Sequence, residues 1–280
     1  MQIKITADST CDLSPELIEK YDIAVVPLSV QIGDESLKDG VDISADEVVD
    51  AFESTGVLAK TSAVSIGEYL EIFRNYQENG YHVIHINIGS GFSTCYQNAC
   101  LAAKEVENVT VIDSANLSTG QGHIVIRAAQ LRDAGKTPAE IKEVLDDLIP
   151  RVDASFLLDT LTYLHKGGRC SAIAALSGNL LKLKPCIEVK NGKMGVGKKY
   201  RGDLVKCYKQ YVKDRLADTD SLEDGLIFIT HSPREEEILK TAQQGVEAKD
   251  YFNKIEVTKA GCTITSHCGP KTLGILYIRK

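Results

Sequence analysis

The sequence predicts an α/β protein with two domains, a parallel-sheet α/β N-terminal domain and an α+β C-terminal domain. Three observations support this fold class. Apolar runs rich in β-branched residues alternate with helical patterns in the first half, which is typical of a parallel sheet. Pro150-Arg151 interrupts that pattern, and beyond it the strands pair around an Asn191-Gly192 turn signal. We therefore expect domains at residues 1–150 and 151–280.

The first half shows strand and helix-start signals in alternation. Four apolar runs predict strands at residues 3–7, 23–30, 83–88 and 109–112. Ser14 precedes Pro15 as an N-cap, and capping boxes begin at Ser44, Ser65 and Thr137. A further helix is expected from about residue 95 to 106, and another after Ser118. This order is that of a parallel α/β sheet with helices between its strands.

The second half predicts fewer helices and more strands. We expect strands at residues 154–158, 226–230, 254–258 and 272–278, with helices at 203–216 and 233–246. Asn191-Gly192 is the sequence signature of a two-residue hairpin turn. This mixture indicates an α+β domain.

Composition excludes several classes of function. The net charge of −7 makes nucleic acid and anionic membrane surfaces poor partners. No apolar run approaches the ~20 residues that a membrane helix needs, so stable membrane insertion is not expected. The N-terminus enters a strand pattern without a signal-peptide pattern, which predicts a cytoplasmic protein. The eight cysteines include no C-x-x-C, and the spacing of Cys262, His267 and Cys268 fits no common zinc site, so neither metal nor cofactor is expected.

One segment is strongly basic. Between Thr160 and Gly202 the only acidic residue is Glu188, so the segment carries +8 and the rest of the chain −15. Its basic residues are Lys166, Arg169, Lys182, Lys184, Lys190, Lys193, Lys198, Lys199 and Arg201. Such a charge predicts a docking surface for an acidic partner or a site for an anionic group, although for any single one of these residues a solvated surface position is the more common interpretation.

Two pairs of hydroxyl residues stand near predicted helix starts. Thr61-Ser62 precedes the capping box at Ser65, and Ser93-Thr94 lies between a predicted strand and the predicted helix that follows it. Loops of this kind gather at the carboxyl ends of parallel strands, and helix N-termini attract anions. We therefore expect a carboxylate or phosphate site; the alternative is that each hydroxyl only caps its helix.

Two enzymatic alternatives were weighed. In a serine hydrolase acting on acyl esters, Ser93 would be the nucleophile, His267 the base and Asp8 or Asp113 the orienting acid. The segment around Ser93 lacks the G-x-S-x-G elbow, so hydrolysis ranks below binding. A nucleotide-dependent transferase lacks support too, because Gly89-Ser90-Gly91 completes neither a Walker loop nor a dinucleotide fingerprint. His267, expected in a Gly/Pro loop, is either a carboxylate ligand or a surface histidine.

Seven motifs in order make the whole chain resemble the DegV family, bacterial fatty-acid-binding proteins that serve as the lipid-carrying subunit of fatty acid kinase. These motifs are Ala7–Leu13, Thr61–Ser65, Ser90–Thr94, Asp113-Ser114, Leu161–Arg169, Leu183–Pro185 and His267–Pro270. The resemblance implies two α/β domains with a long-chain fatty acid in an apolar tunnel, under a lid from the second domain.

The resemblance also implies roles for particular residues. Thr61, Ser62, Ser93 and Thr94 would hold the carboxylate, with His267 nearby. A separate ATP-dependent fatty acid kinase would phosphorylate the bound acid for phospholipid synthesis, so this chain would be a carrier and not an enzyme. Lys166, Arg169 and Arg201 would then form the partner-docking surface.

Four positions depart from the family pattern. Val64 stands where proline is usual, Cys170 and Cys186 where aliphatic residues are usual, and Lys271 where glycine is common. These departures leave the preferred acyl chain open.

Overall fold

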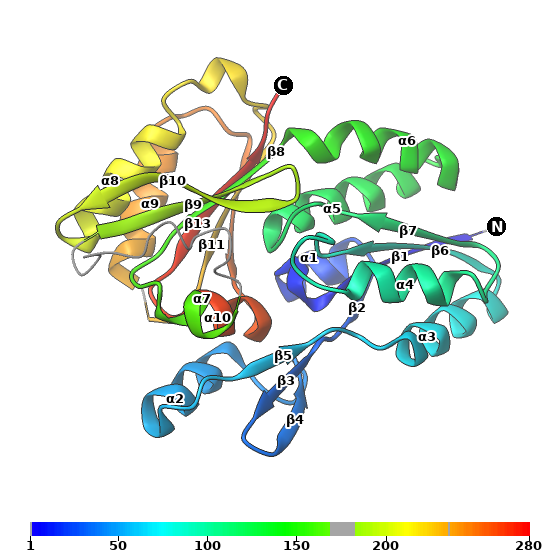
Figure 1. Cartoon of the computed structure of the whole chain (residues 1–280). Coiled ribbons are helices and arrows are strands. Elements are labelled where there is room, and N and C mark those ends of the chain that lie inside the picture. Colours follow the sequence, from blue (N-terminus) through cyan, green and yellow to red (C-terminus); the bar gives the residue numbers. More distant parts are fainter. Residues whose placement is uncertain (1, 169–182, 235) are drawn as a thin grey trace.

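The structure, a computed structural model, describes residues 2–168, 183–234 and 236–280. It contains a four-stranded parallel sheet, a six-stranded mixed sheet and a small three-stranded sheet (Figure 1). The fold class is thus as predicted, with a parallel sheet from the first half and a mixed sheet from the second.

The parallel sheet has the strand order β2-β1-β6-β7. Its strands are β1 (Gln2–Asp8), β2 (Ile23–Val26), β6 (Tyr81–Asn87) and β7 (Val109–Asp113). Helices α3 and α4 cover one face and α5 and α6 the other (Figure 1). The helices of this half are α1 (Pro15–Lys20), α2 (Ala45–Thr55), α3 (Ile66–Glu78), α4 (Cys95–Ala103), α5 (Thr119–Asp133) and α6 (Pro138–Leu148).

The predicted helix starts are confirmed by their hydrogen bonds. The hydroxyl of Ser14 accepts from the backbone N–H of Leu17. The boxes beginning at Ser44, Ser65 and Thr137 are complete, because in each the third helical residue is a glutamate that accepts from the N-cap backbone. These local contacts satisfy N–H groups that no earlier turn can reach.

The six-stranded sheet has the order β10-β9-β8-β13-β11-β12 and is antiparallel except between β11 and β12. Its strands are β8 (Val152–Leu157), β9 (Leu183–Lys190), β10 (Lys193–Arg201), β11 (Leu226–His231), β12 (Lys254–Lys259) and β13 (Leu273–Ile278). The predicted hairpin turn is confirmed, since Asn191 and Gly192 join β9 to β10 with φ of 51° and 69°. The remaining helices are α7 (Thr162–Lys166), α8 (Leu204–Arg215), α9 (Glu236–Glu247) and α10 (Cys262–Cys268).

The third sheet was not predicted. The expected strand at 23–30 is wrong, because Pro27 separates β2 from β3 (Ser29–Ile32), and proline lacks the N–H that a continuous strand needs. Strand β3 pairs antiparallel with β4 (Glu35–Lys38) and β5 (Lys60–Ser62). Together with α2, these strands form a segment that we call the 29–62 unit.

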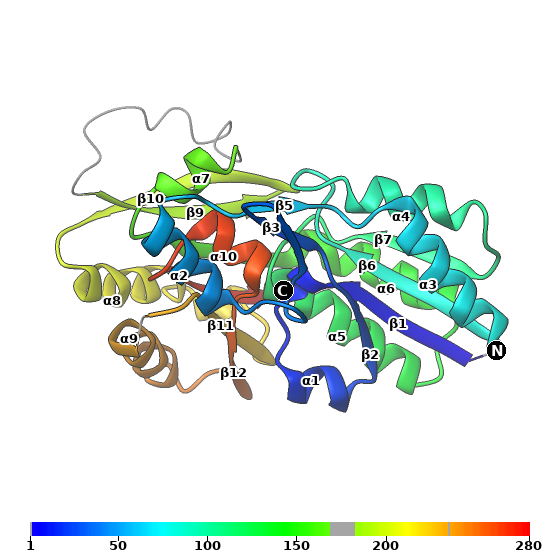
Figure 2. The same cartoon turned by 90° about the horizontal axis from the view of Figure 1, so that it is seen from below.

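The 29–62 unit packs against the C-terminal half of the chain. Figure 2 shows α2, β3 and β5 beside α10, and the first residue of α10, Cys262, completes a small core inside the unit. The other buried members of that core are Val30, Ile43, Val48 and Ala59. Exposed ion pairs join Arg234 and Lys259 to acids of α2, and pairs of this kind contribute little on their own.

Helix α5 lies between the two large sheets and contacts β1, β6, β8 and β13. One hydrophobic core therefore runs from Ile5 through Ile124 to Phe156 and Leu276. A division of the chain at residue 150 stays a prediction, because the core continues across it. Of the residues that depart from the family pattern, Val64 and Cys186 are buried, Lys271 has a φ of 57°, and Cys170 lies outside the described residues.

Within the described residues, no helix combines the length and the apolar character that crossing a bilayer requires.

Candidate functional site

A largely apolar pocket lies where the three sheets meet. The lining residues are Leu28, Thr61, Ser62, Ala63, Ile88, Phe92, Ser93, Leu117, Phe156, Leu164, Met194, Thr263, Ile264, His267 and Cys268. The pocket therefore collects four of the five residues predicted to bind the ligand, from segments up to 206 positions apart.

The polar end of the pocket contains a direct contact between Thr61 and His267. Thr61 Oγ1 lies 2.8 Å from His267 Nε2, and both side chains are partly buried. The prediction that His267 lies in a loop is wrong: it occupies the last turn of α10, and the C-cap residue Gly269 follows with a φ of 78°. Thr61-Ser62 also lies in strand β5 and not in a helix-initiating loop. Pairing with β3 places the two hydroxyls, and this pairing was hidden because the third sheet was not predicted.

Ser93 and Thr94 differ in their placement. Ser93 lines the pocket, and its Oγ accepts from the backbone N–H of Cys95 at 3.3 Å and donates to Cys95 Sγ at 3.2 Å. Thr94 is the N-cap residue of α4, is exposed and makes no side-chain cap bond. It is not among the residues that line the pocket.

Two aspartates shape the loop that carries Ser93. Asp8 is fully buried and accepts from the backbone N–H of Ile88 at 2.7 Å; burial raises the pKa of this carboxyl. Asp113 Oδ1 accepts from the N–H groups of Ser90 and Ala115, at 3.0 and 2.9 Å. Both candidate orienting acids of a hydrolase thus bind backbone groups of loops.

The catalytic pair of the hydrolase alternative is also engaged elsewhere. Ser93 bonds to Cys95, while Nε2 of His267 contacts Thr61. A serine nucleophile requires a hydrogen bond to its base. Among the described residues, the geometry therefore does not favour acyl-ester hydrolysis.

A second apolar chamber adjoins the pocket. Leu117, Phe156, Ile264 and Cys268 line both chambers. The second chamber extends to Gly274 and Leu276 on β13. The space therefore leads from the Thr61–His267 contact toward the middle of the six-stranded sheet.

The β9–β10 hairpin closes against the parallel-sheet half. Met194 of β10 lines the pocket, and the turn residue Gly192 packs against Ala115 and Gly91. A β-carbon at Gly91 would collide with the backbone oxygen of Gly192. The absence of a side chain at Gly91 thus permits this approach, two residues from Ser93.

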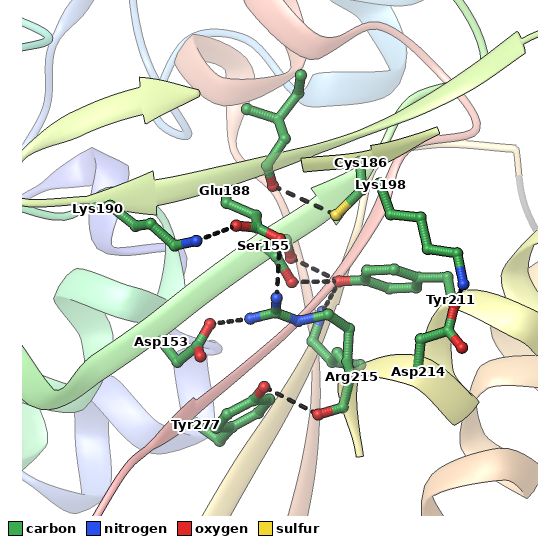
Figure 3. A network of polar contacts seen from close by, with 12 residues as sticks. Asp153, Ser155, Cys186, Glu188, Lys190, Lys198, Tyr211, Asp214, Arg215 and Tyr277 are labelled. Carbon is green, nitrogen blue, oxygen red and sulfur yellow. Dashed lines mark hydrogen bonds and ion pairs between the residues drawn. The ribbon is translucent and has the colours of Figure 1, made fainter. Parts of the chain in front are cut away.

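Part of the basic segment is neutralised within the fold. Lys184 pairs with Asp159, Lys190 with Glu188 and Lys198 with Asp214. Figure 3 shows Glu188 and Asp153 on either side of Arg215, with Lys190 reaching the same glutamate.

The rest of the basic segment is exposed where it is described. Lys193, Lys199 and Arg201 are exposed, and none has an acidic partner within the described ranges. Lys166 is exposed too and lies 5.2 Å from the centre of the Phe52 ring. The predicted docking residue Arg169, and Lys182, lie outside the described residues.

The side chains that make the pocket apolar were not predicted as site residues. Phe156, Leu164, Met194 and Ile264 come from four different elements. Periodicity indicates that such residues are buried, but only the tertiary structure shows which of them leave space between them. No cluster suited to a metal ion is found where the chain is described, and Cys262 Sγ donates to Ile43 O inside the 29–62 unit.

The fold and the pocket define an α/β protein with an apolar ligand pocket between its sheets and a hydroxyl–imidazole pair at one end. The model of the family described as "Uncharacterised protein, DegV family" matches residues 2–280. The chain belongs to the DegV family.

Similar proteins cover the same length. A DegV domain-containing protein of Clostridium acetobutylicum is 35% identical, over 100% of this chain and 99% of its own. The solved structure of a fatty-acid-binding DegV family protein from Thermus thermophilus matches with a TM-score of 0.92 and 28% identity, over 100% of both chains. A stearic-acid-binding protein from Eubacterium ventriosum matches with a TM-score of 0.89 and 30% identity, over 100% of this chain and 99% of the other.

Proposed function

We propose that this chain binds a long-chain fatty acid, with its carboxylate at the Thr61–His267 contact and its acyl chain along the two apolar chambers. The observation that carries the proposal is the Thr61–His267 contact in a space whose lining is largely apolar. Such a site suits a ligand with one polar end and a long apolar body. Binding of fatty acids by two proteins of the same fold, one of them a DegV family protein, supports it.

In this proposal the hydroxyls of Thr61, Ser62, Ser93 and Thr94 donate to the carboxylate, and His267 donates as a neutral ring or pairs with it as a cation. Hydroxyl donors hold an anion without the desolvation penalty of a buried lysine. Thr94 is exposed, so we expect its removal to weaken binding less than removal of Ser93.

We further propose that the chain is a carrier in the cytoplasm, which presents the carboxylate to a separate ATP-dependent fatty acid kinase for phospholipid synthesis. Gly167 packs so closely on His267 that a β-carbon there would lie 2.5 Å from Nδ1, which places the turn after Lys166 beside the polar end. Lys166 and Arg201 are exposed cations, and Arg169 is a third cation of the same sequence segment. Such cations suit an acidic kinase surface or an acyl phosphate.

Lipid extraction with mass spectrometry of the gently purified protein tests the binding proposal. We expect a long-chain fatty acid in about equimolar amount. A protein that yields none, and that does not take up stearic acid after delipidation, would refute the proposal.

The kinase proposal has a separate test. Charge reversal by Lys166→Glu and Arg201→Glu should leave the amount of bound stearic acid unchanged and slow its phosphorylation by the fatty acid kinase of the same cell. Unchanged phosphorylation would remove these two residues from the docking surface. Ser93→Ala is the control for a loss of binding, because it should lower the amount of bound lipid, which the two charge reversals should leave unchanged.

A further inference from the structure

Asp39 is a buried acid in the 29–62 unit. Among the described residues it has three hydrogen-bond donors, and all three lie outside that unit. Asp39 follows β4 and is 4% exposed. Its Oδ1 accepts from the backbone N–H of Cys262 at 2.8 Å, and its Oδ2 from that of Thr263 at 3.0 Å. Ser9 Oγ donates to the same Oδ2 at 3.1 Å. One carboxylate thus joins the unit to α10 and to the turn after β1.

Helix α10 depends on such attachments for its orientation. It has seven residues, too few for a helix that is stable by itself. Asp39 holds its first turn, and Thr61 of the same unit contacts His267 in its last turn. Two contacts, one at each end, tie the helix to one structural unit. Three other residues of the helix line the pocket, namely Thr263, Ile264 and Cys268.

A second buried acid, Asp12, reaches the same helix start from the parallel-sheet half. Its Oδ1 accepts from the N–H of Gly261 at 2.8 Å, and Ser118 Oγ donates to its Oδ2 at 2.5 Å. The two carboxylates differ in what they require. Asp39 must accept from two N–H groups at once, one on each oxygen, whereas Asp12 faces one N–H and one hydroxyl.

We propose that Asp39 is a positioning residue for His267: by accepting from the N–H groups of Cys262 and Thr263, it fixes α10 to the 29–62 unit and sets the place of His267 relative to Thr61. This inference rests on the proposed role of Thr61 and His267 in holding a fatty carboxylate. Asp39 is not itself among the residues that line the pocket. Its carboxylate reaches that lining only through the backbone N–H of Thr263, so it acts through the helix.

The chemistry of the two acids supplies a matched pair of variants. In Asp39→Asn, an amide NH₂ replaces one acceptor oxygen and faces an N–H donor. In Asp12→Asn, the amide oxygen still accepts from Gly261, and its NH₂ donates to the Ser118 hydroxyl, which can accept. The two variants make the same isosteric change, and only the first leaves a donor of α10 without an acceptor.

The first measurement uses delipidated protein labelled with ¹⁵N at the imidazole rings, so it does not depend on lipid. His267 resonances are assigned by their loss in His267→Gln. We expect Asp39→Asn to shift the His267 resonances while the His82 resonances stay in place. Asp12→Asn should leave both sets near their wild-type positions. Unchanged His267 resonances in a folded Asp39→Asn protein would overturn the proposal.

The second measurement compares stearic acid with stearyl alcohol, which has the same chain but no carboxylate. If Asp39→Asn displaces His267, the ligand carboxylate loses a buried hydrogen bond at that ring. We therefore expect about tenfold weaker binding of the acid, with a change of less than about threefold for the alcohol. Equal losses for both ligands would show a merely structural role. If Asp39→Asn does not fold, Asp39→Ser, which keeps one side-chain oxygen as an acceptor, is measured in its place and judged by the same two results.

The two readouts separate this inference from the proposed function. If the wild-type protein binds no stearic acid, the proposed function fails, yet the resonances of His267 still decide whether Asp39 positions it.

Discussion

Replacing Thr61 with valine should weaken fatty acid binding through the carboxylate alone. Valine keeps the β-branched shape that suits strand β5 and removes only the hydroxyl. That hydroxyl lies 2.8 Å from His267 Nε2 at the polar end of the pocket. A hydrogen bond to a charged group contributes about 1.5–3 kcal/mol, so we expect the Kd for stearic acid to rise roughly 10- to 150-fold.

A double-mutant cycle with His267→Gln tests the contact itself. Because the two side chains touch, their effects on binding should depart from additivity by about 0.5–3 kcal/mol. Isothermal titration with stearic acid, and with stearyl alcohol as the ligand without a carboxylate, gives the four Kd values. Thr55→Val, a matched substitution at an exposed residue of the same unit, is the control. Additive effects, or an equal loss for the alcohol, would refute this account of the site.

Three other outcomes follow from the same structure. Gly91→Ala should displace the β9–β10 turn and lower both Tm and lipid retention. The control is Gly195→Ala in β10, where a β-carbon meets no atom within 4 Å, and it should lower neither. Thermal melts and lipid extraction measure the two effects. Cys268→Phe should fill the passage between the two chambers and shift the bound lipid toward shorter chains by mass spectrometry, and an unchanged lipid profile would contradict the path proposed for the acyl chain. Burial raises the pKa of Asp12 to about 8, so the folded state holds a proton that the unfolded chain releases near pH ~4. The free energy of unfolding should therefore fall as the pH rises, up to about 8. Above about pH 6.5, where the buried histidines no longer oppose this trend, urea melts should show a slope that Asp12→Asn lessens; Asp8, whose pKa burial also raises, adds to the slope in both proteins.

Local sequence signals predicted the elements that depend on local interactions. The capping boxes at Ser44, Ser65 and Thr137 and the turn at Asn191-Gly192 were all found where the sequence indicates them. Each involves hydrogen bonds or dihedral angles within about four residues, so the residues that decide them are adjacent in the sequence.

The binding residues were predicted with uneven success. Hydroxyls at Thr61, Ser62 and Ser93 do line one pocket with His267, but the reason given for their placement holds only for Ser93, which follows a parallel strand. Thr61 reaches the pocket through a sheet that periodicity did not reveal, because its strands have only three or four residues. Strands that short give too few alternations to separate from a loop.

The sequence alone determined the fold class, the helix starts, the hairpin and, through the ordered motifs, the family. Only the tertiary structure decided that α10 carries His267 to Thr61, that two buried aspartates hold the start of this helix, and that the apolar space continues into a second chamber. The physical reason is the separation in sequence between the residues that interact. Capping and turn formation are satisfied by neighbours in the chain, whereas a pocket is the space left between side chains that meet only after distant segments have packed.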